Sequence, residues 1–234
     1  AALSATGATT LVAPVKGIAN TRQWILDQHQ GDRLLMFDDD LKFAMRREDE
    51  PTKFLPAGGG DVGRMLDILW RSLRDFHVVG LASRSGANRV TSTWRFNERT
   101  WDVMGFRMDT VRKHGFRYRQ QFMEDFDIHL QFLTHGYPSA LLNSFTKDDF
   151  GSNAEGGCST YRDDAGQAAA ALDLALEWDP LVKVRQAKGW AGQEARTDVL
   201  VYWKKAFEAG QKWRREQGIP LETALYLYSE TGLL

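Results

Sequence analysis

The sequence predicts an α/β protein in which a mixed sheet is flanked by helices and followed by a helical C-terminal extension. Three observations support this class. Short apolar runs alternate with amphipathic segments in the first part of the chain, as strands and helices in layers do. Helical patterns dominate after Gly166. A chain of 234 residues with 43% hydrophobic content can bury a sizeable core.

The first elements are a strand over residues 9–13, closed by Pro14, and a helix over residues 20–30 that ends before Gly31. The unbroken apolar run RLLMF, residues 33–37, indicates a strand buried on both faces of a parallel sheet.

The segment PAGGGDVGRMLDILWRSLRDF predicts a glycine turn followed by an amphipathic helix. Asp61 is the expected N-cap. No Gly-Lys-Ser/Thr follows the glycines, which argues against a phosphate-binding loop. The core-facing stripe of this helix is expected to be Met65, Leu66, Leu69, Leu73 and Phe76.

The remaining elements follow from the same patterns. Strands are expected at 77–83, 90–96 and 138–145, and a long polar loop at 146–166. Helices are expected at 108–115, 124–136, 165–178, 196–218 and 221–230. We expect a catalytic core over residues 1–165 and a helical extension over 166–234 that packs on it.

The charge distribution is uneven. The net charge is only −1, yet residues 84–119 and 183–215 each contain nine Lys or Arg against three acidic residues. Such blocks suit contacts with a polyanion and equally suit solvated helix faces. Tryptophans interleave with both blocks: Trp94, Trp101, Trp190, Trp203 and Trp213. Ordinary core packing is the alternative explanation for these rings.

The composition predicts a protein without membrane contact. No apolar run approaches the ~20 residues of a membrane span, and no basic-then-apolar leader opens the chain. The single cysteine, Cys158, fits a reducing compartment. We therefore expect a cytoplasmic location, in the host cytoplasm if the chain is viral.

Two acidic groups are the candidate site. Asp38, Asp39 and Asp40 follow the strand at 33–37, and ligands bind at the carboxyl ends of strands in α/β sheets. Crowded carboxylates repel unless a cation neutralises them, so a bound metal is one explanation and a solvated turn is the other.

The second acidic group, Glu124, Asp125 and Asp127, begins a predicted helix. Carboxylates in a first turn stabilise the helix dipole by about 0.3 to 1 kcal/mol, so this group has a structural explanation as well as a catalytic one.

The order of these motifs is more specific than any one of them. The segment KGIANTRQWILDQHQGDRLLMFDDD is followed by VMGFRMDTVRKHGFRYRQQFMEDFDIHLQFLTHGYPSALLNSF. Over roughly residues 9–150 the chain resembles the GT-A nucleotide-sugar glycosyltransferases, especially inverting enzymes with an Asp-x-Asp strand end and a Glu-Asp helix. The resemblance implies a GT-A, Rossmann-like core whose strand for the nucleotide base would lie upstream of Ala1.

The resemblance also implies a donor site. Arg22 matches an arginine that contacts the nucleotide or its phosphates, and Lys16 is a second candidate. Asp38 and Asp40 match the Asp-x-Asp pair, which holds Mn²⁺ or Mg²⁺ on the donor diphosphate, with Asp39 between them. A hard divalent ion takes such oxygen ligands and keeps substrate phosphates beside them. Arg84, which begins the first basic block, is a further donor-binding candidate.

The acceptor side follows in the same way. Asp125 matches the catalytic base, with Glu124 as its acidic neighbour. The segment that shapes the acceptor site corresponds to Gly105, Phe106 and Arg107.

The sequence departs from the family pattern in two places. Gln23 stands where Asn usually follows the arginine. Every histidine precedes the point where many relatives place a histidine metal ligand, so either Asp148 or Asp149 replaces it or the metal has only one protein ligand.

The acceptor is inferred from a looser resemblance to phage DNA-modifying glycosyltransferases associated with base-oxidising dioxygenases. It implies transfer to a hydroxymethylpyrimidine in DNA, with Trp94 or Trp101 holding the unstacked base. The alternatives are a protein or saccharide hydroxyl as acceptor, a two-metal nucleotidyltransferase and a noncatalytic DNA-binding scaffold.

Overall fold

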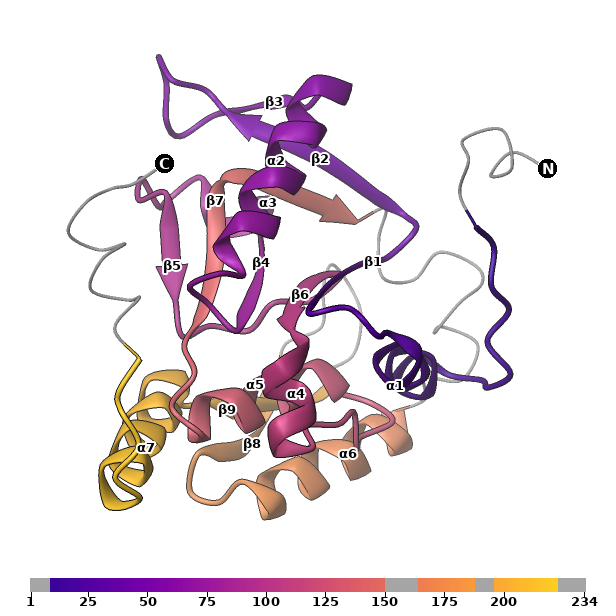
Figure 1. The fold of residues 1–234 in the computed structure, drawn as a ribbon, viewed down its shortest axis with the longest axis vertical. Coiled ribbons are helices and arrows are strands. Elements are labelled where there is room, and N and C mark those ends of the chain that lie inside the picture. The colour runs from indigo at the N-terminus through magenta and orange to yellow at the C-terminus, as the bar shows by residue number, and fades with distance from the viewer. Residues whose placement is uncertain (1–8, 150–163, 188–195, 223–234) are drawn as a thin grey trace.

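The computed structural model describes residues 9–149, 164–187 and 196–222 (Figure 1). Its helices are Ile18–Gln28 (α1), Gly59–Ser72 (α2), Arg84–Ala87 (α3), Met108–His114 (α4), Glu124–Thr134 (α5), Asp164–Glu177 (α6) and Trp203–Glu216 (α7). Its strands are Arg33–Phe37 (β1), Leu41–Arg46 (β2), Phe54–Pro56 (β3), Val78–Ser83 (β4), Trp94–Phe96 (β5), Val103–Arg107 (β6), Ser139–Asp149 (β7), Val182–Ala187 (β8) and Arg196–Val201 (β9).

A central mixed sheet confirms the α/β class. Its order is β1-β6-β4-β7-β2-β3, with β5 paired to β7. Strands β4 and β7 are parallel, whereas the other pairs of this sheet are antiparallel. The layered arrangement with flanking helices is consistent with a Rossmann-like fold (Figure 1).

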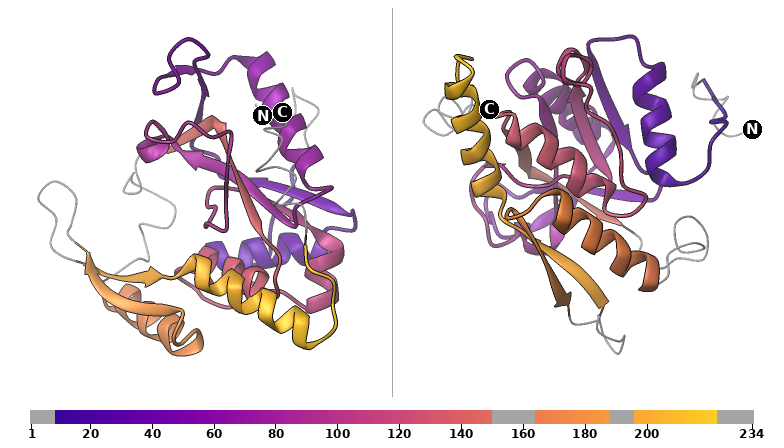
Figure 2. Two further views of the ribbon diagram at one scale, coloured as in Figure 1. Left: turned by 90° about the vertical axis from the view of Figure 1, so that its left-hand side faces the viewer. Right: turned by 90° about the horizontal axis from the view of Figure 1, so that it is seen from below.

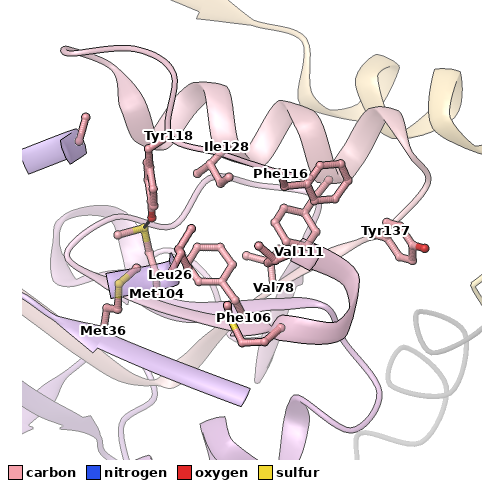
Figure 3. Packing of buried hydrophobic residues seen from close by; sticks show 13 residues of the cluster. Leu26, Met36, Val78, Met104, Phe106, Val111, Phe116, Tyr118, Ile128 and Tyr137 are labelled. Atoms are coloured by element: carbon pink, nitrogen blue, oxygen red, sulfur yellow. Dashed lines mark hydrogen bonds between the residues drawn. The ribbon is translucent and has the colours of Figure 1, made fainter. Parts of the chain in front are cut away.

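Neighbouring residues on the central strands face opposite sides of the sheet, as the two-residue period of a strand requires. Val78 and Phe106 join the cluster beneath α1, α4 and α5 (Figure 3). Val79 and Leu81 join the second cluster, beneath α2. Both faces of the sheet are therefore covered by helices, which explains why the strand sequences are apolar with little alternation.

Strand β1 corrects one expectation. The strand itself lies where RLLMF predicts it, and its side chains do reach both faces, with Met36 in one cluster and Leu35 against the other. However, β1 is an edge strand that pairs antiparallel with β6. The prediction of a parallel neighbour was wrong because two-sided burial does not fix strand direction.

Three further predictions in the first third of the chain were wrong. Residues 9–13 form no strand, and Leu11 and Val12 are 71% and 86% exposed. At α2 the N-cap is Gly58, and Asp61 accepts a hydrogen bond from the Gly58 N–H at 3.0 Å from inside the first turn. Leu66 is exposed, whereas the other four predicted members of the α2 stripe are buried.

The structure contains strands that were not predicted and one strand that is longer than predicted. Strands β2, β3 and β6 were not predicted, and the strand at 90–96 is reduced to β5. Strand β7 continues to Asp149 because β2 pairs with its second half. The polar loop predicted over 146–166 therefore begins later, and its residues 150–163 lie outside the described residues, as does Cys158.

The C-terminal part contains a two-stranded sheet as well as helices. The helix predicted over 196–218 was wrong for its first six residues, which form β9 and pair with β8. The sequence signal is alternation, since Val199 and Val201 are buried while Leu200 between them is exposed. Most of the helix predicted over 221–230, and Trp190, lie outside the described residues.

Helix α7 lies alongside α5 (Figure 2), and one apolar cluster joins α5, α6, the β8-β9 sheet and α7. A Cβ atom at Gly210 would lie 2.1 Å from the Leu133 carbonyl oxygen, so the two helices cross at a distance that only glycine permits. None of the helices that the structure describes is long and apolar enough to cross a membrane.

Candidate active site

The Asp38–Asp40 triplet lies in the turn between β1 and β2, at one end of the central sheet. The Asp38 N–H donates a hydrogen bond to the Asp102 carbonyl oxygen at 2.9 Å. This contact fixes the start of the turn against the residue that precedes β6. Asp38 is partly buried, whereas Asp39 and Asp40 are exposed.

Arg22 joins the two acidic groups. It lies on α1 and is only 6% exposed. One guanidinium nitrogen donates to Glu124 Oε1 at 2.7 Å, and the other donates to Asp38 Oδ1 at 2.9 Å. Asp38 and the start of α5 are thus brought together, although Glu124 lies 86 positions after Asp38 in the sequence. The family resemblance predicts that Arg22 contacts the donor nucleotide or its phosphates, and the structure gives its guanidinium two carboxylate partners.

The surroundings of Arg22 keep the guanidinium charged. Burial alone would lower the pKa of Arg22, but Tyr118 and the carboxylates of Asp38, Glu124 and Asp125 raise it above its usual value. The pKa of Tyr118 is raised mainly by burial. The phenol is therefore neutral beside this ionic network, and its hydroxyl lies 3.5 Å from Met104 Sδ.

Asp125 has a separate cationic partner. Arg99 lies 3.0 Å from Asp125 Oδ2, and its guanidinium carbon is 3.7 Å from the ring centre of Phe126 and 4.7 Å from that of Trp101. Asp125 is 8% exposed. An arginine in this position orients the carboxylate, and two aromatic faces hold the arginine.

His129, one turn further along α5, holds the backbone beneath Asp125. The Thr100 N–H donates to His129 Nε2 at 3.1 Å, so Nδ1 carries the proton and donates to the Asp125 carbonyl oxygen at 2.7 Å. Burial lowers the pKa of His129 to about 4. The imidazole is therefore neutral at pH 7 and ties the loop before β6 to the first turn of α5.

Protonation of His129 is expected to lower the unfolding free energy of the protein in acid. Because the folded-state pKa of His129 lies below its ordinary value of 6.5, its contribution is complete above about pH 6.5 and is lost as the pH falls towards about 4. The loss amounts to about 3 kcal/mol of unfolding free energy. His77, His114 and His135, whose pKa values burial also lowers, act in the same direction.

Denaturant unfolding between pH 7.5 and pH 4.5 measures this effect. His129→Gln is expected to show a shallower dependence of unfolding free energy on pH than the parent protein. His29→Gln serves as the control, because His29 contacts the Arg33 carbonyl oxygen and not Thr100 or Asp125. Equal slopes for His129→Gln and the parent would contradict the assignment.

Asp127 belongs to a structural network rather than to the site. It is completely buried, and Arg119, Gln131 and the Trp178 indole N–H all donate to its carboxylate. Three donors satisfy the charge and connect α5 to α6. The acidic group at 124–127 is thus divided: Glu124 and Asp125 face the site, and Asp127 anchors the helix.

Further charged residues gather at the same end of the sheet. Arg84, directly after β4, lies 3.2 Å from Asp148 on β7. Lys147, buried beside it, forms an ion pair with Asp102, and its Nζ is 4.3 Å from the Trp101 ring centre. Sequence reasoning missed Lys147 because it falls in a polar run that was assigned to a loop. It also missed Arg99, which carries no motif.

The structure keeps four predicted residues away from this site. Trp94 is buried in the α2 cluster and stacks on Phe76. Gly105 and Phe106 lie within β6, where Phe106 is fully buried in the core. Arg107 lies at the end of β6 opposite Asp102 and pairs with Asp109. The buried side chains of Trp94 and Phe106 have little surface to offer an acceptor, and the apolar character of β6 explains why Phe106 lies in the core.

Lys16 lies exposed just before α1, where its carbonyl oxygen accepts a hydrogen bond from Asn20. It is therefore near the helix that carries Arg22 but is not part of the Arg22 network.

The acidic side chains suit a divalent ion that is shared with a substrate. Within the described residues, no group of three or more His, Cys, Asp or Glu side chains is arranged to hold a metal. Two aspartates at one turn supply hard oxygen donors, and Mg²⁺-type sites commonly use one or two carboxylates and complete the shell with substrate phosphates and water. The donor set fits such a shared site and does not form a closed protein cage.

A family model described as TET-associated glycosyltransferase matches residues 8–151, which is more than half of the chain. The match covers β1 to β7 and every residue of the Arg22 network. No curated protein and no solved structure matches the chain.

Proposed function

The chain belongs to the TET-associated glycosyltransferase family and is a glycosyltransferase, and on that premise we propose that it transfers a sugar from a nucleotide-sugar donor to a hydroxymethylpyrimidine in DNA. The observation that supports the site is the bridge formed by Arg22 between Asp38 and Glu124. Arg22 joins Asp38, a member of the Asp-x-Asp pair, to Glu124, the neighbour of the proposed base Asp125. This contact supports a single site of the kind that the resemblance to Asp-x-Asp glycosyltransferases implies.

Asp38 and Asp40 are proposed to hold Mn²⁺ or Mg²⁺ with the donor diphosphate. When bound, such an ion stabilises the departing diphosphate as a Lewis acid. The exposed Asp40 carboxylate is open to an incoming ligand, whereas the Asp38 carboxylate is already oriented by Arg22. Arg84 is proposed to bind the donor from the same end of the sheet.

Asp125 is proposed as the base. Its carboxylate accepts the proton of the acceptor hydroxyl while that oxygen forms a bond to the sugar carbon, and the bond from that carbon to the diphosphate breaks with its electron pair. Attack from the face opposite the diphosphate inverts the stereochemistry. Arg99 positions the carboxylate of Asp125, and His129 holds its backbone carbonyl group.

Incubation of the protein with a panel of nucleotide sugars, Mn²⁺ and an oligonucleotide that contains 5-hydroxymethylcytosine or 5-hydroxymethyluracil tests this function. Mass spectrometry is expected to show a gain of one sugar residue on the modified oligonucleotide and none on the unmodified one. Transfer only to protein or saccharide hydroxyls would reject the DNA acceptor. Pyrophosphate release from a nucleoside triphosphate would support the nucleotidyltransferase instead.

Removing one carboxylate tests the metal site. Asp40→Ala is expected to weaken Mn²⁺-dependent donor binding by at least about 10-fold, because even residues that only support metal ligands contribute that much. Calorimetric titration of donor with and without Mn²⁺ measures the effect. Asp32→Ala, an exposed carboxylate just before the other end of β1, is the control and should leave donor binding unchanged. Full Mn²⁺-dependent affinity in Asp40→Ala would exclude Asp40 as a ligand.

A further inference from the structure

A groove of about 920 Å³ is lined by Arg99 and Phe126, which both adjoin Asp125. One wall comes from the segment between β5 and β6, with Arg99 and Trp101, and from Phe126 at the start of α5. The other wall comes from residues 198–205, the end of β9 and the start of α7. Arg99 and Phe126 connect the groove directly to Asp125, since the first pairs with its carboxylate and the second follows it in the chain.

The second wall is basic where it is most exposed. Lys204 and Lys205 are exposed at the first turn of α7, and Arg185 lines the groove from β8. Two acidic residues also line the groove, but both face arginines. Glu98 pairs with Arg95 at 2.9 Å, and Asp198 lies 3.6 Å from Arg185 and 3.7 Å from Arg196. The groove therefore presents a surplus of positive charge.

Aromatic rings alternate with these cations. The Lys205 ammonium lies 4.8 Å from the Tyr202 ring centre, and the Arg99 guanidinium lies over Phe126 and Trp101. The Trp203 ring stacks on Phe126, with ring centres 5.9 Å apart, and joins the two walls. Cationic side chains that follow a phosphate backbone, combined with ring faces for unstacked bases, are the features that bind single-stranded nucleic acid.

We propose that the β9–α7 segment, which lies beyond the residues matched to the family, forms one wall of the acceptor site and binds the phosphates of a DNA strand whose modified base is extruded towards Asp125. This inference rests on the proposed DNA acceptor. A base must leave the duplex stack for its hydroxymethyl group to reach a buried carboxylate. Lys204 and Lys205 contact phosphates that flank the target nucleotide, while the core wall holds its ring.

A charge-reversal pair on α7 tests the groove against a matched control. The groove variant is K204E/K205E, and the control is K212E/R215E, further along the same helix and outside the groove. Both variants change the net charge equally. Each also removes one i,i+4 ion pair with a glutamate, Lys204 with Glu208 at 4.0 Å and Lys212 with Glu216 at 3.8 Å. Because acidic residues stabilise the first turn of a helix and destabilise its last turn, the control variant should weaken α7 more than the groove variant does.

The probe is a single-stranded oligonucleotide that contains one 5-hydroxymethylcytosine, measured by fluorescence anisotropy over a range of salt concentrations. K204E/K205E is expected to weaken binding by at least about 10-fold and to reduce the slope of log K against log salt by about 1.4, because each phosphate contact to a single strand contributes about 0.7. K212E/R215E should stay near the parent. Donor hydrolysis without acceptor should be the same in all three proteins.

The possible outcomes distinguish a failure of the proposed DNA-binding groove from a failure of the proposed sugar transfer to DNA. Equal loss of oligonucleotide binding in both variants, or no loss in either, would overturn the groove even if the parent protein transfers sugar to DNA. Selective loss in K204E/K205E supports the groove, including for a parent protein that binds the strand but transfers sugar to a different hydroxyl. In that case the segment binds DNA phosphates, but its role as a wall of the acceptor site fails together with the proposed acceptor.

Discussion

Asp125→Asn is expected to reduce sugar transfer by about 10²- to 10⁴-fold, the usual contribution of a positioned general base. Asparagine preserves the shape of the side chain and can still accept a hydrogen bond from Arg99, but it cannot take the acceptor proton at neutral pH. Donor affinity should change little, because Asp38 and Asp40 are unaltered. Steady-state transfer kinetics and calorimetric donor binding together measure the two quantities.

Asp109→Asn is the matched control for this change. Asp109 is also in the first turn of a helix and pairs with an arginine, but it lies at the opposite end of the sheet from Asp38. Its variant should transfer sugar normally. Normal turnover in Asp125→Asn would remove Asp125 from the mechanism, and loss of donor affinity in that variant would make it a donor-binding residue.

Arg22→Met is expected to lower the unfolding free energy by about 3 to 5 kcal/mol. Methionine fills similar space but removes the cation shared by Asp38 and Glu124, and the Glu124 side chain is only 5% exposed. Breaking a buried ion pair from one side costs more than the pair contributes, because a buried charge remains. Chemical denaturation of the variant and parent measures the loss.

Adding Glu124→Gln to Arg22→Met should recover about 1 kcal/mol or more, because the double variant no longer buries that carboxylate without its arginine. Arg22→Lys keeps a charge but not the two-armed geometry and should fall between the parent and Arg22→Met. Additive effects of Arg22→Met and Glu124→Gln would show that the two residues are not coupled in the folded protein.

Local patterns predicted most helices and four of the seven strands of the central sheet, namely β1, β4, β5 and β7. The runs RLLMF and HVVGLAS, and the stripe of Met65, Leu69, Leu73 and Phe76, are strong signals because burial imposes their periodicity. Strand direction and neighbours did not follow from them. Strand β1 pairs antiparallel with β6, and nothing in either apolar run specifies the partner.

The candidate site was predicted only in part, because local sequence patterns do not specify tertiary contacts. Acidic residues and Arg22 have recognisable motifs, and the structure brings Asp38, Arg22 and Glu124 into contact. Arg99 and Lys147 have no motif, since they are defined by tertiary contacts with Asp125 and Asp102. Aromatic residues were the least informative, because the same ring type packs in the core at Trp94 and lines the groove at Trp101.

We propose that the aspartate turn and the start of α5 form one site, with Arg22 between them. Crystals of the protein with Mn²⁺ and the nucleoside diphosphate left by its active donor would show whether they do. We expect an anomalous Mn²⁺ peak coordinated by Asp40, and a diphosphate whose free end points towards the Asp125 carboxylate. A metal and diphosphate bound away from Asp38–Asp40, or an Asp125 carboxylate that faces away from them, would contradict it.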